Sequence, residues 1–195
     1  MYLVILIVAY LLLRSIMATF LVLFVVVPSI MVAMGAGGWM GIGLTPPSAS
    51  APTIITTLAV ADSIHLLVSM FNRMRAGHSQ RDSLLYSIRV NGKPIFLTSL
   101  TTALGFLSMN FSDSSPFHDL GNITAIGVMA AWIYSIVLLT ILISFVPLKS
   151  KATLAKLDDK MGKLGVYVAS RYKSVLTASV IISVSILSLI PLNEI

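Results

Sequence analysis

Long apolar runs separated by short polar connectors dominate the chain. A helix needs about 20 apolar residues to cross the hydrocarbon core of a bilayer. We therefore expect membrane-spanning helices over five runs: residues 16–38, 49–71, 94–112, 120–146 and 173–191. A sixth apolar run, residues 1–13, would reach only about 20 Å as a helix, so we expect the chain to begin inside a span whose outer part is absent. The predicted fold class is all-α, a polytopic transmembrane helix bundle.

Arg14 decides how the first two apolar runs are divided. A single helix over residues 1–27 would place the guanidinium near the bilayer centre, where a charge is costly. We therefore expect a tight turn at Arg14-Ser15.

The basic residues fall in alternate connectors. They are Arg14, then Arg73, Arg75, Arg81, Arg89 and Lys93, then Lys149, Lys151, Lys156, Lys160, Lys163, Arg171 and Lys173. The connectors in between contain no Lys or Arg. Because cytoplasmic loops collect Lys and Arg, we expect the basic connectors to be cytoplasmic and both ends of the chain to lie outside.

Two basic connectors have the pattern of helices that lie on a membrane surface. Ser79 and Asp82 form a plausible capping box for a helix over 80–91. In residues 152–164, apolar side chains recur at helical spacing between lysines, a pattern attracted to anionic membrane lipids. A purely topological role for these charges stays equally open.

Composition excludes several classes of function. Hydrophobic residues make up 57% of the chain and charged residues only 10%, which an ordinary soluble domain does not show. The net charge of +6 does not indicate nucleic-acid binding, because the basic residues sit in connectors rather than on one face of a domain. The chain has no cysteine, which excludes disulfides and thiolate metal sites.

Asp62 is the only charged residue in the interior of any complete predicted span, about twelve residues from the start of its span. A charged Asp at mid-membrane costs about 2.5–3.5 kcal/mol on insertion scales. Because a low dielectric favours the neutral carboxyl, Asp62 could bind and exchange a proton. His65, three residues on, shares its helix face and is a candidate relay partner. The alternatives are an acid that only holds helices together and a histidine that only packs.

An enzyme is not predicted. Ser63 and His65 are about 200° apart around a helix, so they cannot share a proton. One Asp and one His are too few ligands for a catalytic metal. We therefore expect no catalytic residue, no metal and no cofactor.

Two other patterns predict helix packing. Gly121 with Ala125, and Gly127 with Ala131, form small-residue stripes that allow neighbouring helices to approach closely. The hydroxyls of "LTSLTT", residues 97–102, are expected mostly to bond carbonyls of their own helix.

Three motifs occur in a recognisable order: "ADSIHLL", "GKPIFLTSLTTALGFLSM" and "FHDLGNITAIGVMAAWIYSIVLLTILISFVPL". Together they resemble the membrane domain of resistance-nodulation-division (RND) permeases. The most similar branch is the mycobacterial-membrane-protein-large (MMPL) and hydrophobe-exporter type, whose core is similar to the sterol-sensing domain. The resemblance divides the chain into a core with spans two to six at 1–148, a cytoplasmic connector at 149–172 and span seven at 173–195.

The resemblance implies a proton-driven exporter of hydrophobic or lipid-like substrates in the bacterial inner membrane. Asp62 matches the acidic motif of the fourth span, and His65 matches a histidine common in this branch. Relatives often read Gly-x-Asp-Asp or Gly-x-Asp-Tyr where this chain has Ala59-Val60-Ala61-Asp62, so the partner of Asp62 could differ here. In relatives that partner lies in the second half of the transporter, which we expect to be missing here, as are the large external domains. A homo-oligomer stays possible.

Two other functions stay open. The chain could be a sterol- or lipid-sensing regulatory module without transport, or an auxiliary subunit of protein export.

Overall fold

The computed structural model describes residues 2–148 and 155–187, and the regular elements in these ranges are all helical. The chain divides into two compact units, residues 1–151 and residues 152–195. The first unit contains α1 (Tyr2–Leu13), α2 (Ile16–Trp39), η1 (Ser48–Ser50), α3 (Ala51–Arg75), α4 (Gln80–Leu107), η2 (Ser108–Phe111), α5 (Ser115–Ile133), η3 (Tyr134–Leu138) and α6 (Leu139–Phe145). The second unit contains α7 (Ala155–Ser170) and α8 (Tyr172–Leu187).

In the described part of the chain, four helical segments are long and apolar enough to cross a membrane, which confirms the predicted helical membrane bundle. They are Ile16–Trp39, Ser48–Arg75, Gln80–Phe111 and Ser115–Phe145. The fifth predicted span, 173–191, corresponds to α8. Its apolar stretch, Tyr172–Ser185, is shorter than a span, and residues 188–191 lie outside the described residues.

The chain breaks between α1 and α2 at Arg14, as predicted. Arg14 has a φ of 46°, in the left-handed region that ends a right-handed helix. Ser15 then caps α2, because its side chain accepts a hydrogen bond of 3.3 Å from the amide of Ala18. The alternative of one helix over residues 1–27 is therefore wrong.

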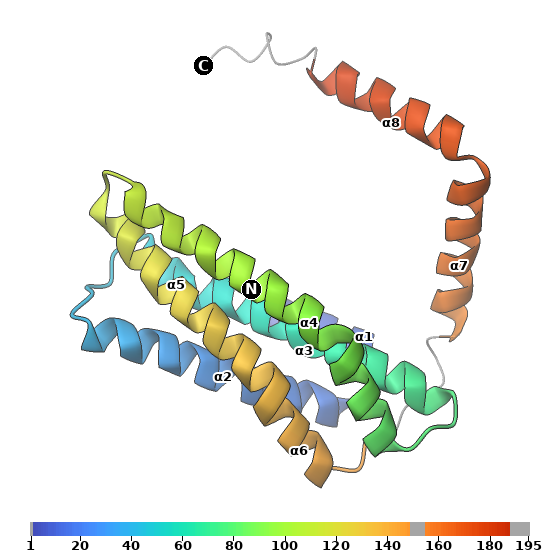
Figure 1. Ribbon diagram of the computed structural model, residues 1–195, viewed down its shortest axis with the longest axis horizontal. Helices are drawn as coiled ribbons and strands as arrows, with labels where there is room; N and C mark the ends of the chain where they lie inside the picture. The colour runs from blue at the N-terminus through green and yellow to red at the C-terminus, as the bar shows by residue number, and fades with distance from the viewer. Residues whose placement is uncertain (1, 149–154, 188–195) are drawn as a thin grey trace. The chain divides into compact units, whose positions relative to one another are not determined.

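Helix α4 is one continuous element where the sequence predicts two. The predicted cap is confirmed, since the Ser79 hydroxyl accepts from the Asp82 amide at 3.1 Å and donates to the Asp82 carboxylate at 2.7 Å. The separate surface helix over 80–91 and the span over 94–112 are wrong as distinct elements. Pro94 lies inside α4. A proline removes only one backbone donor, so the helix bends and continues; Figure 1 shows α4 changing direction along its length.

The predicted span over 120–146 begins earlier, at Ser115, and is interrupted by the π-helical turn η3. Helices α5 and α6 continue into each other through this turn. In the second unit, the predicted amphipathic segment 152–164 falls largely in α7, and residues 152–154 lie outside the described residues.

The small-residue stripes of α5 pack as predicted. Ala125 and Ala131 are buried. A Cβ at Gly127 would meet the side chain of Ile55 on α3 and lie 2.9 Å from Ala33 on α2. The missing side chain therefore lets α2, α3 and α5 come together at one level of the bundle.

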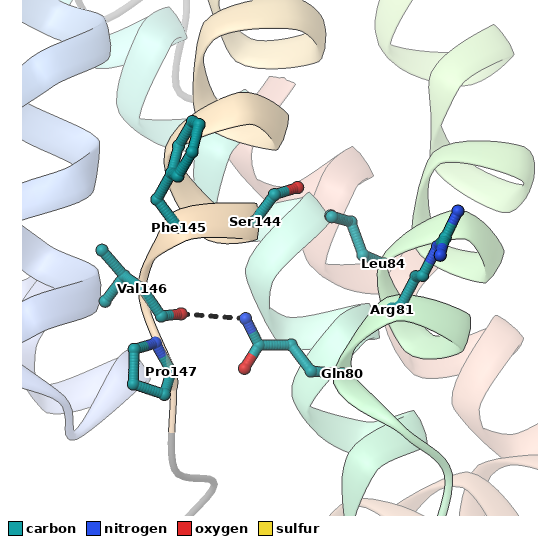
Figure 2. A pocket seen from close by; sticks show the side chains of 7 residues that line it. All are labelled: Gln80, Arg81, Leu84, Ser144, Phe145, Val146 and Pro147. Carbon is teal, nitrogen blue, oxygen red and sulfur yellow. Dashed lines mark hydrogen bonds between the residues drawn. The ribbon is translucent and has the colours of Figure 1, made fainter.

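The basic connectors of the first unit meet at one end of it. The side chain of Gln80, at the start of α4, bonds the last turn of α6 (Figure 2). Arg14 lines a cavity with Pro147 and Leu148, just after α6. The described parts of these connectors therefore lie at one end of the first unit, although Arg89 and Lys93 fall inside α4 and not in a connector. That this end is cytoplasmic stays a prediction.

Candidate functional site

Asp62 lies in the middle of α3, and its side chain is buried, with 8% of its surface exposed. Among the buried residues of the described chain it is the only one with a charged side chain. Its carboxylate accepts a hydrogen bond of 3.4 Å from the hydroxyl of Ser99 on α4. That distance is long for a hydroxyl and a carboxylate, so the contact is weak. In the described residues no Lys or Arg pairs with the acid.

Ser99 reaches Asp62 because α3 and α4 form an antiparallel hairpin. The turn lies at residues 76–79, so α4 runs back along α3. Two more contacts fix this alignment: the Ser87 hydroxyl donates to the carbonyl of Leu66 at 2.6 Å, and the Arg73 guanidinium lies 4.4 Å from the centre of the Tyr86 ring.

Sequence reasoning missed Ser99. Two other hydroxyls of this stretch behave as predicted, since Thr98 donates to Ile95 and Thr101 donates to Leu97 on their own helix. Ser99 is the exception because it faces α3. Counting from the turn would not have found this pair, because Asp62 lies 14 residues before the turn and Ser99 lies 20 residues after it.

His65 lies one turn beyond Asp62 and is exposed. In the described part of the chain its ring has no hydrogen-bond partner. Ser69, on the same stripe, is half-buried. Ser63 is fully buried on another side of α3, and its hydroxyl donates to the carbonyl of Ala59 at 2.7 Å. Asp62 therefore lies at the border between the buried and the open sides of α3.

The open side of α3 is unlike that of its neighbours. The exposed residues in its membrane-spanning part are Thr57, Ala61 and His65, and no large apolar side chain of α3 is exposed. On α2, by contrast, Phe20, Phe24 and other large apolar side chains are exposed. A small and polar stripe gains little from contact with lipid, so this side of α3 is suited to protein or water.

The arrangement can hold and release a proton at one carboxyl group. In the described ranges, no three His, Cys, Asp or Glu side chains gather to hold a metal ion. The site offers a buried acid, one hydroxyl donor and an adjacent polar surface.

Comparison with protein families confirms the resemblance of the sequence motifs. The sequence model of the MMPL family matches residues 1–165. A search of curated proteins finds no match. The matched region includes all of the first unit, with the Asp62 site in α3. The chain therefore belongs to the MMPL family, a family of RND-type membrane transporters of hydrophobic substrates.

Proposed function

We propose that the chain forms the membrane core of an exporter of hydrophobic or lipid-like substrates that is driven by the proton-motive force, with Asp62 as the proton-relay residue. The observation that supports this proposal is that Asp62 is the only buried acid among the described residues and has no charged partner among them, and that it lies beside an open polar stripe on the same helix. An intramembrane acid that only joins helices would be enclosed by its neighbours, whereas Asp62 borders a surface that water or protein can reach.

The free energy released by proton entry is similar to the free-energy cost of a charged Asp62 in the membrane. A proton that crosses 100 mV releases about 2.3 kcal/mol, and a charged Asp at mid-membrane costs about 2.5–3.5 kcal/mol. Binding a proton removes the charge, and α3 can then pack differently against α4. Because α3 is tightly packed against α2 and α5 at Gly127 and Ile55, a movement of α3 would be transmitted to those helices.

His65 is the second residue of the proposed relay. Its exposed ring stands one helical turn from Asp62 on the open side of α3, where a proton would arrive or leave. This open side is also where we place the second half of the transporter, which in relatives supplies the partner of the acid. We propose that the protein lies in the bacterial inner membrane, with the basic end of the first unit in the cytoplasm.

Ser99→Ala is expected to slow proton-coupled export about threefold. Interhelical hydrogen bonds in membranes are worth about 0.6 kcal/mol on average, which corresponds to about that factor. The Ser99 hydroxyl orients the carboxylate through one weak bond, so its loss should impair the relay without abolishing it. The measurement is efflux of Nile red from liposomes that contain the full-length protein, driven by an imposed pH gradient and repeated with a protonophore.

Thr101→Val is the matched control for Ser99→Ala. It removes a hydroxyl two residues away on α4 whose hydrogen bonds are to its own helix. This variant should keep the wild-type rate. Equal losses in the two variants, or no loss in Ser99→Ala, would remove Ser99 from the mechanism.

A further inference from the structure

A cavity of about 620 Å³ lies where α4 begins and α6 ends, at the basic end of the first unit (Figure 2). From α4 it is lined by Gln80, Arg81 and Leu84, and from the end of α6 by Ser144 and Phe145. The Asp62 site lies elsewhere, in the middle of α3 and α4, so the proton relay does not use this cavity.

Gln80 fixes the shape of the cavity. Its side-chain nitrogen donates to the carbonyls of Ile143 at 2.7 Å and Val146 at 2.9 Å, and its side-chain oxygen accepts from the amide of Leu148 at 2.9 Å. The bonds to Val146 and Leu148 pair backbone groups just after α6. The Ile143 carbonyl gains a second donor, because it already accepts from the Val146 amide at 3.3 Å. The side-chain amide of Gln80 therefore joins the start of α4 to the end of α6, and these two walls of the cavity cannot easily move apart.

Arg81 is the cation that lines this cavity. It is exposed, and within the described residues its guanidinium has no hydrogen-bond or ion-pair partner. The neighbouring acid, Asp82, is bonded to the capping Ser79 and does not line the cavity. Ser144 already donates its proton to Thr140 on its own helix. The recognition chemistry here is thus a single unpaired guanidinium, which favours an anion and above all a phosphate.

The rest of the lining is apolar. Leu84, Phe145 and Pro147 border the cavity, and Phe145 has 81% of its surface exposed. A free phosphate or a nucleotide would gain nothing from these side chains. A phospholipid would contact both the guanidinium and the apolar lining, because its headgroup is charged and its acyl region is apolar.

The position of the cavity in the fold also favours a phospholipid. The cavity lies at the ends of two membrane-spanning segments, where lipid headgroups meet water. A second cavity of about 280 Å³ shares Pro147 with it and is lined by another arginine, Arg14, also unpaired among the described residues. Both cavities therefore combine one guanidinium with an apolar wall at the same end of the bundle.

We propose that the cavity between the first turn of α4 and the last turn of α6 binds an anionic phospholipid, with Arg81 contacting the headgroup phosphate and Leu84 and Phe145 contacting its apolar part. The bound lipid would bridge α4 and α6 beside the Gln80 hydrogen bonds. Occupancy would stabilise the packing of these two helices.

The test is native mass spectrometry of the delipidated full-length protein titrated with phosphatidylglycerol or with zwitterionic phosphatidylcholine. We expect phosphatidylglycerol to bind in preference to phosphatidylcholine. Arg81→Gln should weaken phosphatidylglycerol binding about fivefold, the loss expected for one basic residue near an anionic lipid surface. Arg81→Lys, which keeps the charge, should recover most of the binding.

Arg89→Gln is the matched control. Arg89 is exposed on the same helix and does not line the cavity, so this variant loses the same charge at another place. It should bind phosphatidylglycerol like the wild type. Equal weakening by Arg81→Gln and Arg89→Gln would overturn the proposal, because it would show general attraction to basic residues. Displacement of the lipid by an equal concentration of inorganic phosphate would also overturn it, because the apolar wall would then contribute nothing.

Discussion

Asp62→Asn should abolish proton-coupled export while the protein stays folded. Asparagine has nearly the same shape as aspartate but carries no exchangeable charge, so α3 would be held permanently in its neutral state. Because the substitution removes the cost of a buried charge, the apparent melting temperature in detergent should be unchanged or higher. Nile red efflux should fall to the rate of protein-free liposomes, and proton uptake should fall with it.

The matched control for Asp62→Asn is Asp113→Asn. Asp113 is exposed in the connector between α4 and α5, outside the spans. Asp113→Asn therefore makes the same chemical change without affecting the proposed relay. Its efflux should equal that of the wild type. A lipid-sensing module without transport predicts a different pattern, in which neither substitution matters and lipid binding is insensitive to the proton gradient. Coupled efflux that survives Asp62→Asn would exclude this acid from the mechanism.

Gly127→Ala is expected to destabilise the bundle by about 1–3 kcal/mol, the usual cost of adding a methyl group to a full core. The added Cβ would meet Ile55 and come within 2.9 Å of Ala33. Both of these residues are fully buried, so neither side chain has free space to enter. The measurement is the apparent melting temperature of the full-length protein in detergent, followed by size-exclusion chromatography of heated samples.

Gly105→Ala tests whether this loss comes from packing. Gly105 lies within α4, and a Cβ there would meet no atom within 4 Å. Alanine favours a helix over glycine by up to about 1 kcal/mol, so this variant should be as stable as the wild type or more so. If both substitutions lower the melting temperature equally, close packing at Gly127 does not hold the three helices together.

The sequence predicted helix boundaries best where they depend only on neighbouring residues. The cost of a guanidinium in lipid was enough to divide the first apolar run at Arg14, and Ser79 with Asp82 was enough to start α4. The glycine stripe of α5 was predicted for the same kind of reason, since close helix packing requires small residues.

Features set by tertiary contacts were predicted less well. The sequence predicted a surface helix over 80–91 and a separate span over 94–112, but α4 continues through Pro94 as one helix. Nothing in the sequence of residues 134–138 indicates a π-helix. The role of Gln80 depends on carbonyls more than sixty residues away, and a single polar side chain does not reveal its partner.

The candidate site was predicted in part. The identity of the acid followed from its charge alone, because no other charge lies in the interior of a complete predicted span. Its hydroxyl partner, Ser99, required the alignment of α3 with α4, and the exposure of His65 required knowledge of which side of α3 is covered.

The central claim is that the Asp62 carboxyl changes its protonation during transport, and infrared difference spectroscopy tests it most directly. Spectra of the full-length protein in liposomes, recorded from about pH 4 to about pH 9, would be compared with those of Asp62→Asn. We predict a carboxyl C=O stretching band that appears and disappears within this range in the wild type and is absent in the variant. A band from Asp62 that stays constant across the whole range would contradict the account.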